Sequence, residues 1–214
     1  MKIDWYKHYT ETKKLSYNKE YFEKNLKWDK PYIKLIKEYI KPKGRILEVG
    51  CGPARTAISI AYKKFEITAV DNDKKMLEMA KENSKIAEVN INFKLMNMFD
   101  VNKKFEKDFF DCVAHQGVLE HFKKRKIIRA IKKQLYISPF IIFSVPLNTK
   151  FNHKYFRDNI YRNLWSKKKW IRDILKDFKI IENKQVRQRS DNLLIVIKRG
   201  DKNKLSSNIE TLKN

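Results

Sequence analysis

Short apolar runs alternate with helical patterns along most of the chain. Five of these runs have the length of buried strands: residues 45–49, 66–70, 91–95, 109–114 and 138–146. Between them, apolar residues recur every three to four positions, which is the spacing of one face of a helix. Strands that alternate with helices in this way form parallel sheets with both faces covered, so the pattern predicts an α/β domain.

Two further strands are expected near the end of the chain. Residues 178–186 and 193–198 are rich in apolar side chains, and the polar segment 189–192 between them favours a hairpin. A hairpin places antiparallel strands at one edge of an otherwise parallel sheet. We assign the domain to residues 44–199, and we expect the polar tail of residues 200–214 to be mobile.

Residues 1–43 precede this domain and are polar and rich in aromatic side chains. Apolar positions at helical spacing predict a helix over residues 29–40, with Asp29 as its N-cap and Pro31 in its first turn. We therefore treat the segment as a helical extension of the domain. Its tyrosines are compatible with lining a substrate site and with ordinary packing of a helix on the sheet edge.

The first strand ends in an acid and two glycines, Glu48-Val49-Gly50-Cys51-Gly52. Glycine lets the chain turn sharply and lets a ligand approach the backbone without a Cβ in the way. A helix is predicted from residue 54, so the turn lies at a helix N-terminus, where nucleotide-like ligands bind in open α/β sheets. The third glycine of the dinucleotide fingerprint is missing, because Arg55 stands there. Glu48 would repel a phosphate, but it suits a ligand that carries an ammonium and a sulfonium.

These residues resemble the first motif of the class I S-adenosylmethionine-dependent methyltransferases, (Glu/Asp)-x-Gly-x-Gly. A second stretch, Asp111-Cys112-Val113 followed by Val118-Leu119-Glu120-His121, is similar to the branch that includes the ubiquinone-biosynthesis methyltransferases. The resemblance covers residues 44–198 and includes the order of the elements. It implies a doubly wound, Rossmann-like sheet of seven strands, mostly parallel with an antiparallel last strand, and helices on both faces.

The resemblance also implies S-adenosylmethionine as the cofactor and S-adenosylhomocysteine as the product. Glu48, Gly50 and Gly52 would hold the methionine end. Asp71 ends the second strand about 20 residues after the glycine turn, where a carboxylate can accept hydrogen bonds from both ribose hydroxyls. The nearby Asp73 fits better as the N-cap of the next helix.

Further contacts are expected around the adenine. Asn97 stands where the family often has an aspartate that accepts from the adenine amino group, and its amide oxygen can still accept. Met98 or Phe99 would supply an apolar face against the ring, or would belong to the core. The complete set of expected cofactor contacts is Glu48, Gly50, Cys51, Gly52, Asp71, Asn72, Met76, Asn97, Met98, Phe99, His115 and Gln116.

His121 is the candidate general base, because a neutral imidazole can accept a proton from a hydroxyl acceptor near neutral pH. Glu120 could orient or polarise it. The alternative is that His121 starts the next helix or only packs there. No metal is expected. The sequence lacks the (Asn/Asp)-Pro-Pro-(Tyr/Phe) signature of base-directed amino-methyltransferases and the Pro-Cys pair of cytosine methylation. Both absences count against nucleic-acid bases as acceptors.

The segment of residues 148–165 follows the most apolar strand and, in the family that the sequence resembles, commonly covers the acceptor. Arg157 and Arg162, with Tyr155 and Tyr161, would suit an anionic or aromatic acceptor. A surface helix with solvated arginines is the simpler alternative.

The formal net charge of +24 raises nucleic acid or an anionic membrane as a partner. The lysines are spread over the whole chain, so we favour solvated lysine faces over a functional basic surface. No apolar run approaches membrane-spanning length, and the first residues lack the apolar core of a signal peptide. Cys51 and Cys112 are interpreted as reduced core residues, and these features together indicate a cytoplasmic protein.

We therefore expect an enzyme that transfers a methyl group from S-adenosylmethionine to an oxygen or nitrogen of a small-molecule acceptor. Two alternatives stay open: an RNA methyltransferase that uses the basic surface, and a non-catalytic protein that binds S-adenosylmethionine. The sequence contains no pattern that identifies the acceptor or the oligomeric state.

Overall fold

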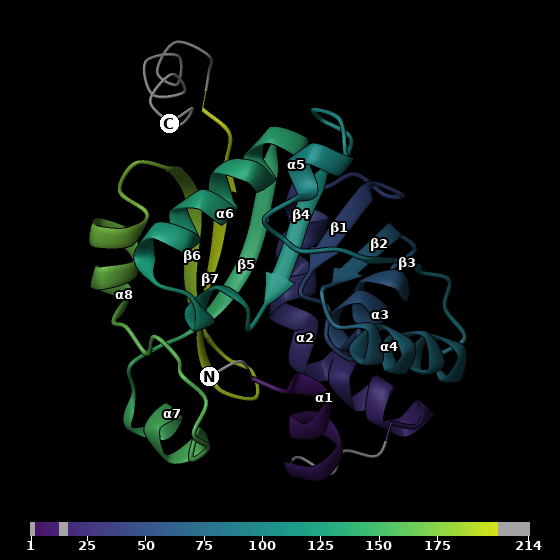
Figure 1. The fold of residues 1–214 in the computed structure, drawn as a ribbon. Helices are drawn as coiled ribbons and strands as arrows, with labels where there is room; N and C mark the ends of the chain where they lie inside the picture. The colour runs from purple at the N-terminus through teal and green to yellow at the C-terminus, as the bar shows by residue number, and fades with distance from the viewer. Residues whose placement is uncertain (1–2, 13–16, 201–214) are drawn as a thin grey trace.

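The structure, a computed structural model, describes residues 3–12 and 17–200 of the 214-residue chain. Its centre is one seven-stranded sheet in the order β3-β2-β1-β4-β5-β7-β6 (Figure 1). The strands are β1 (Arg45–Val49), β2 (Glu66–Asp71), β3 (Asn92–Leu95), β4 (Cys112–Gln116), β5 (Phe140–Pro146), β6 (Lys179–Arg187) and β7 (Asp191–Lys198). The first five pair in parallel, and β7 pairs antiparallel with β5 and β6. The predicted Rossmann-like sheet with its C-terminal hairpin is confirmed.

Helices cover both faces of this sheet (Figure 1). They are α1 (Trp5–Lys7), α2 (Lys19–Tyr39), α3 (Arg55–Ala61), α4 (Lys74–Ile86), α5 (Val101–Lys104), α6 (Lys124–Ile137), α7 (Lys150–Tyr155) and α8 (Lys167–Lys169), with the short η1 (His8–Thr12), η2 (Leu119–His121) and η3 (Trp170–Ile174). The tail that we expected to be mobile, residues 200–214, lies outside the described residues except for Gly200.

The two faces of the sheet explain the continuous apolar runs of the sequence. Ile46 and Leu47 are adjacent in β1 and both are fully buried, but they belong to different core clusters. Ile46 packs in the cluster that includes Ile36 of α2, and Leu47 packs in the cluster that includes Ile131 of α6. A strand covered on both sides needs apolar side chains at every position rather than at alternate ones.

The start of α2 corrects the sequence-based prediction. The helix begins at Lys19, and its N-cap is Asn18, whose side chain accepts from the backbone amide of Tyr21 at 2.8 Å. Pro31 therefore lies inside the helix rather than in its first turn. An internal proline removes one helical hydrogen bond, but α2 also buries Tyr32, which is fully shielded from solvent. The burial of its apolar face offsets the local cost of the proline.

Asp29 is consequently not an N-cap. It lies in the middle of α2 and is fully buried. Its Oδ2 accepts from Nδ2 of Asn25 at 2.8 Å, and its Oδ1 accepts from Nε2 of Gln116, the last residue of β4, at 3.2 Å. This acid thereby ties the N-terminal extension to the carboxyl edge of the sheet.

The structure also bears on the two cysteines and on membrane-spanning segments. Cys51 and Cys112 are both buried and free, which agrees with their interpretation as core residues. Within residues 3–12 and 17–200, none of the helices has both the length and the apolar character that a membrane span requires.

The strand order reverses beside β1. The chain adds β2 and β3 on one side of β1 and then returns to place β4 on its other side. The loops after β1 and β4 therefore leave the sheet in different directions at its carboxyl edge, which is where open α/β sheets bind their ligands.

Candidate functional site

The turn after β1 contains three residues with a left-handed backbone. Gly50, Gly52 and Ala54 have φ values of 63°, 53° and 60°, a region that strongly favours glycine. A Cβ on Gly50 would lie 3.0 Å from Cγ2 of Val118, which belongs to the loop after β4. A side chain at Gly50 would therefore require a shift of Val118 and a strained left-handed backbone.

Asp71 holds this turn in place from the end of β2. Its Oδ2 accepts from the amide of Gly52 at 2.9 Å, and its Oδ1 accepts from the amide of Asp73 at 3.0 Å. Burial raises the pKa of Asp71, and the amides of Gly52 and Asp73 oppose that rise. Asp73 caps α4 by accepting from the amides of Lys75 and Met76, as predicted. Each oxygen of Asp71 keeps a lone pair for a further donor.

The expected adenine contacts lie in the loop after β3. Oδ1 of Asn97 accepts from the amide of Phe99 at 2.9 Å, so this oxygen already closes a turn. The ring of Phe99 packs edge-to-face on Phe122, with centroids 5.4 Å apart. Met98 is nearly buried in the core. Asn97 is exposed to solvent.

Three other predicted cofactor contacts lie in or beside the turn and differ in their exposure to solvent. Cys51 is buried in the core cluster that contains α2, Asn72 is exposed, and Met76 is fully buried. Cε of Met76 lies 3.8 Å from the position of a Cβ on Gly52. Of these three, Met76 is the side chain that contacts the turn from α4.

The side chain of His115 lies apart from the other predicted cofactor contacts. It is fully buried, its ring stacks on Phe143 at 5.2 Å, and its Nε2 lies 3.3 Å from Oε1 of Gln134 in α6. The strand β4 extends to Gln116, two residues beyond the predicted end. Because side chains alternate across a strand, His115 faces α6 while Gln116 faces α2.

The buried position of His115 predicts a pH dependence of stability. Burial lowers the pKa of His115 from 6.5 to about 4. As the pH falls, the unfolded chain binds a proton before the native state does. The free energy of unfolding therefore decreases between about pH 6.5 and pH 4, by about 3 kcal/mol from this residue. Denaturant titrations of wild type and His115→Phe across this range measure the difference in slope; parallel curves would contradict the prediction.

Gln116 is the centre of a buried polar network at the carboxyl edge. Its Nε2 donates to Asp29 and also to Oγ1 of Thr56 at 3.3 Å. Its Oε1 accepts from Oγ of Ser144 and from Nε2 of Gln188, both at 3.1 Å. The network connects α2, α3, β5 and the turn between β6 and β7, and so it fixes the floor of the adjacent pocket.

A pocket of about 490 Å³ opens above this network. Its wall includes Glu120 and His121 from η2 after β4, Tyr9 from the N-terminal segment, and Phe156 from the segment of residues 148–165. Of the twelve expected cofactor contacts, only Gln116 lines this wall. The structure therefore brings the candidate base and the two covering segments together in one cavity, next to the glycine turn.

His121 is oriented by the covering segment. Its Nδ1 lies 2.8 Å from the backbone oxygen of Tyr161. A carbonyl oxygen can only accept, so Nδ1 carries a hydrogen and the neutral ring has its lone pair on Nε2. The ring also packs edge-to-face against Trp5, with centroids 4.9 Å apart. The imidazole is thus held from both sides in the tautomer that a base requires.

Glu120 lies on the Nε2 side of this histidine. Its Oε1 is 3.8 Å from Nε2 of His121, and its Oε2 is buried without a hydrogen-bond partner among the described residues. Burial raises the pKa of Glu120, and the nearby His121 opposes the rise. This carboxyl group can stabilise a positive charge on the imidazole.

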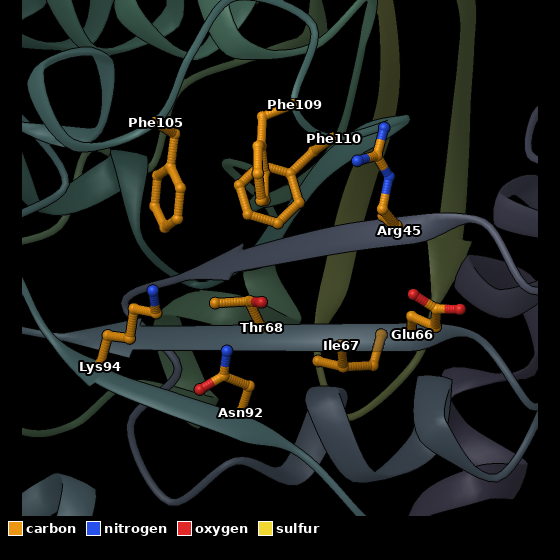
Figure 2. Close-up of a pocket in the computed structure, with 9 residues that line it drawn as sticks. All are labelled: Arg45, Glu66, Ile67, Thr68, Asn92, Lys94, Phe105, Phe109 and Phe110. Atoms are coloured by element: carbon orange, nitrogen blue, oxygen red, sulfur yellow. The ribbon is translucent and has the colours of Figure 1, made fainter.

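A second hollow, of about 270 Å³, lies at the opposite end of the sheet (Figure 2). It is bounded by the first residues of β1 and β2, Arg45 and Glu66, and by the rings of Phe105, Phe109 and Phe110. The helix above it, α5, has only 4 residues and leaves the sheet uncovered there. It contains none of the predicted site residues, so we place the candidate site at the carboxyl edge.

Parts of the chain are similar to known methyltransferases. A family model described as "Methyltransferase domain" matches residues 46–136. A putative methyltransferase of Geobacillus sp. (strain WCH70) is 28% identical over 137 residues, covering 63% of this chain and 55% of the relative. The ubiquinone biosynthesis O-methyltransferase of Coxiella burnetii is 28% identical over 90 residues, covering 42% of this chain and 38% of the relative.

The match over residues 46–136 and the similarity to these relatives support the class I S-adenosylmethionine-dependent methyltransferase family for this chain. The chain spans about half the length of the curated relatives it matches, or less. Solved structures share the fold. The PH0226 protein from Pyrococcus horikoshii OT3 has a TM-score of 0.72 at 19% identity, covering 94% of this chain and all (100%) of that chain. Magnesium protoporphyrin IX methyltransferase from Synechocystis PCC 6803, with bound S-adenosylhomocysteine, has a TM-score of 0.62 at 18% identity, covering 82% and 83%.

The cofactor of these methyltransferases is S-adenosylmethionine, and the residues at the turn fit it. Oε2 of Glu48 is buried and lacks a hydrogen-bond partner among the described residues. Burial raises the pKa of Glu48 well above its usual range, and the charge of Asp29 adds to the rise. A ligand ammonium would supply the missing donor and favour the ionised carboxylate. The lone pairs that Asp71 retains would suit the ribose hydroxyls.

Several residues at this candidate site were not predicted from the sequence. Trp28, Arg55 and Arg189 line the pocket, and Asp29 anchors its floor. Asn25 and Asp29 are four residues apart, so they lie on the same face of a helix and can form a hydrogen bond. This spacing could have indicated the position of Asp29. No local pattern marks Arg189, because only the turn between β6 and β7 carries it to the pocket.

Proposed function

We propose that this methyltransferase transfers a methyl group from S-adenosylmethionine to an oxygen or nitrogen of a small-molecule acceptor. The observation that carries the proposal is the orientation of His121. Its Nδ1 is bonded to the backbone oxygen of Tyr161, which leaves the Nε2 lone pair available in a pocket beside the glycine turn.

In the proposed reaction the cofactor supplies the methyl group, and the chain aligns the acceptor and removes its proton. S-adenosylmethionine supplies a methyl group on a positively charged sulfur, which makes the group reactive toward a nucleophile. The pocket aligns the acceptor for in-line attack. Nε2 of His121 takes the proton of an acceptor hydroxyl, and the resulting imidazolium is stabilised by the Tyr161 carbonyl and by Glu120.

The proposed cofactor contacts follow the turn. Glu48, Gly50, Cys51 and Gly52 would hold the methionine end, together with Gln116. Asp71 would bind the ribose, with Asn72 and Met76 beside it, and Asn97, Met98 and Phe99 would surround the adenine. We omit His115 from this set, because its burial under α6 leaves it out of reach of a ligand in the pocket.

Two observations support a small acceptor. The pocket volume of about 490 Å³ is in the range of small-molecule sites. Among the similar proteins, one is named as an O-methyltransferase of ubiquinone biosynthesis and another as a magnesium protoporphyrin IX methyltransferase. RNA is the second candidate acceptor, and the net charge of +24 favours it.

Calorimetric titration with S-adenosylhomocysteine, followed by turnover at increasing salt, tests the proposal. We expect the product to bind at one site, and turnover of a neutral small acceptor to respond little to salt. An RNA substrate would instead lose affinity steeply with salt, because its binding releases counterions. Absence of S-adenosylhomocysteine binding would contradict the proposal. Binding without transfer to any hydroxyl or amine acceptor would favour a non-catalytic role.

A further inference from the structure

Arg189 presents unused hydrogen-bond donors in the pocket. It lies in the turn between β6 and β7 and lines the pocket wall. Its Nε and Nη2 are buried and have no hydrogen-bond partner among the described residues. Its guanidinium carbon lies 4.9 Å from the ring of Trp28, and its Nη1 lies 4.0 Å from Oδ1 of Asp29. The arginine is thus held on one side by a ring and an acid, while two donors remain unsatisfied.

Arg55 adds a second guanidinium to the same wall. It donates to the hydroxyl oxygens of Tyr21 at 3.3 Å and Tyr9 at 3.5 Å. Within residues 3–12 and 17–200, no carboxylate forms an ion pair with it. Burial lowers the pKa of Arg189, and the charge of Arg55 lowers it further. Arg55 and Arg189 thus place two positively charged side chains on the wall of one pocket.

The third arginine of the pocket differs. Both terminal nitrogens of Arg162 donate to the carboxylate of Asp158, and the guanidinium carbon lies 4.5 Å from the ring of Phe156. Its charge and its donors are already used within the covering segment. Arg189 thus keeps unsatisfied donors and Arg55 lacks a carboxylate partner among the described residues, whereas Arg162 is paired and Arg157 does not line the pocket.

The charges around the pocket do not balance. Among the described residues, Asp29 is the one carboxylate that forms an ion pair with Arg189, at 4.0 Å, and Arg55 forms none. In the part of the chain that the structure describes, neither Glu48 nor Glu120 forms an ion pair with Arg55 or Arg189. S-adenosylmethionine carries a net positive charge that an ionised Glu48 would offset, so its binding would leave the charges of Arg55 and Arg189 unbalanced. A pocket in this state favours a negatively charged second ligand.

We propose that the methyl acceptor carries a carboxylate or phosphate group and that Arg189, assisted by Arg55, binds that group. The inference rests on the proposed function and specifies its substrate class. Arginine suits the role because its planar fork presents parallel donors to two oxygens of one anion. Trp28, Tyr9 and Phe156 also line the pocket and would accommodate a flat ring attached to the anion.

The test compares charged and neutral probes of the same shape. The three isomers of hydroxybenzoate and the three corresponding hydroxybenzamides are titrated calorimetrically into the protein saturated with S-adenosylhomocysteine. We expect at least one acid to bind ten or more times tighter than its amide. Arg189→Met should remove this preference by weakening the acid and leaving the amide unchanged. Arg125→Met, which changes an exposed arginine of α6, is the matched control and should retain the preference.

Three results would overturn the inference. The first is that no acid binds better than its amide to the wild-type complex, including the case in which no acid binds. The second is that the preference survives in Arg189→Met. The third is that Arg189→Met weakens S-adenosylhomocysteine about tenfold but leaves 5′-methylthioadenosine unchanged, because the arginine would then bind the carboxylate of the cofactor itself. Failure of wild type to bind S-adenosylhomocysteine would instead count against the proposed function.

Discussion

Replacing His121 by alanine is expected to lower the rate of methyl transfer to a hydroxyl acceptor by a factor of about 10² to 10⁴. The variant loses the Nε2 lone pair that would receive the acceptor proton, whereas the glycine turn and Asp71 are untouched. The affinity for S-adenosylhomocysteine should therefore stay within about twofold of wild type. Steady-state rates with a hydroxyl acceptor, measured alongside calorimetric binding of the product, separate the two effects.

His153→Ala is the matched control for this experiment. His153 is an exposed histidine of α7 that bonds to Oδ1 of Asn148 and does not line the pocket. Its removal should leave the rate at the wild-type level. If His121→Ala also turned over at the wild-type rate, His121 would be a packing residue and the base would have to be sought elsewhere.

Replacing Asp71 by asparagine is expected to weaken binding of S-adenosylhomocysteine about 100-fold. A hydrogen bond to a charged group contributes about 1.5–3 kcal/mol, and the carboxylate can accept from two ribose hydroxyls. A loss of about 3 kcal/mol corresponds to roughly two powers of ten in affinity. The amide side chain has the same shape and keeps one oxygen for the amide of Gly52. Calorimetry of the two proteins measures the change directly.

Asp73→Asn serves as the control for Asp71, because it alters the neighbouring acid that caps α4. Asparagine is also a good N-cap, so both the fold and the affinity should be retained. Equal affinity of wild type and Asp71→Asn would mean that Asp71 only holds the turn through the amides of Gly52 and Asp73 and does not bind the ribose.

Local patterns predicted the strands well, since the central strands are buried on both faces. Ile46 and Leu47 face opposite helical layers, and a run of apolar residues is the direct consequence. The cap of α4 at Asp73 was equally readable, because an N-cap depends on atoms within three residues of it. The start of α2 was missed, because Asp29 and Pro31 also form a plausible helix start. The true cap, Asn18, is a local signal of the same kind, since its side chain accepts from the amide of Tyr21.

The error at His115 has a different origin. β4 continues two residues beyond its predicted end, and this extension fixes the helix layer that the side chain of His115 faces. The end of the strand depends on its pairing with β5 rather than on local composition. His115 pairs in register with Phe143, and Gln116 with Ser144. The extension turns His115 into a core residue under α6 and makes Gln116 the link to Asp29, 87 residues away in the sequence.

The α/β fold, the glycine turn with its two carboxylates and the motif that contains His121 could all be predicted from local sequence patterns. These features are short, and their physical causes are local: apolar runs for buried strands, glycine for a left-handed turn, and an acid at a strand end. Two other features emerge only from the packed molecule: the carbonyl of Tyr161 sets the tautomer of His121, and Arg55, Asp29 and Arg189 meet at one pocket. Those contacts join segments far apart in the chain, and their geometry exists only after the sheet and its covering segments have packed together.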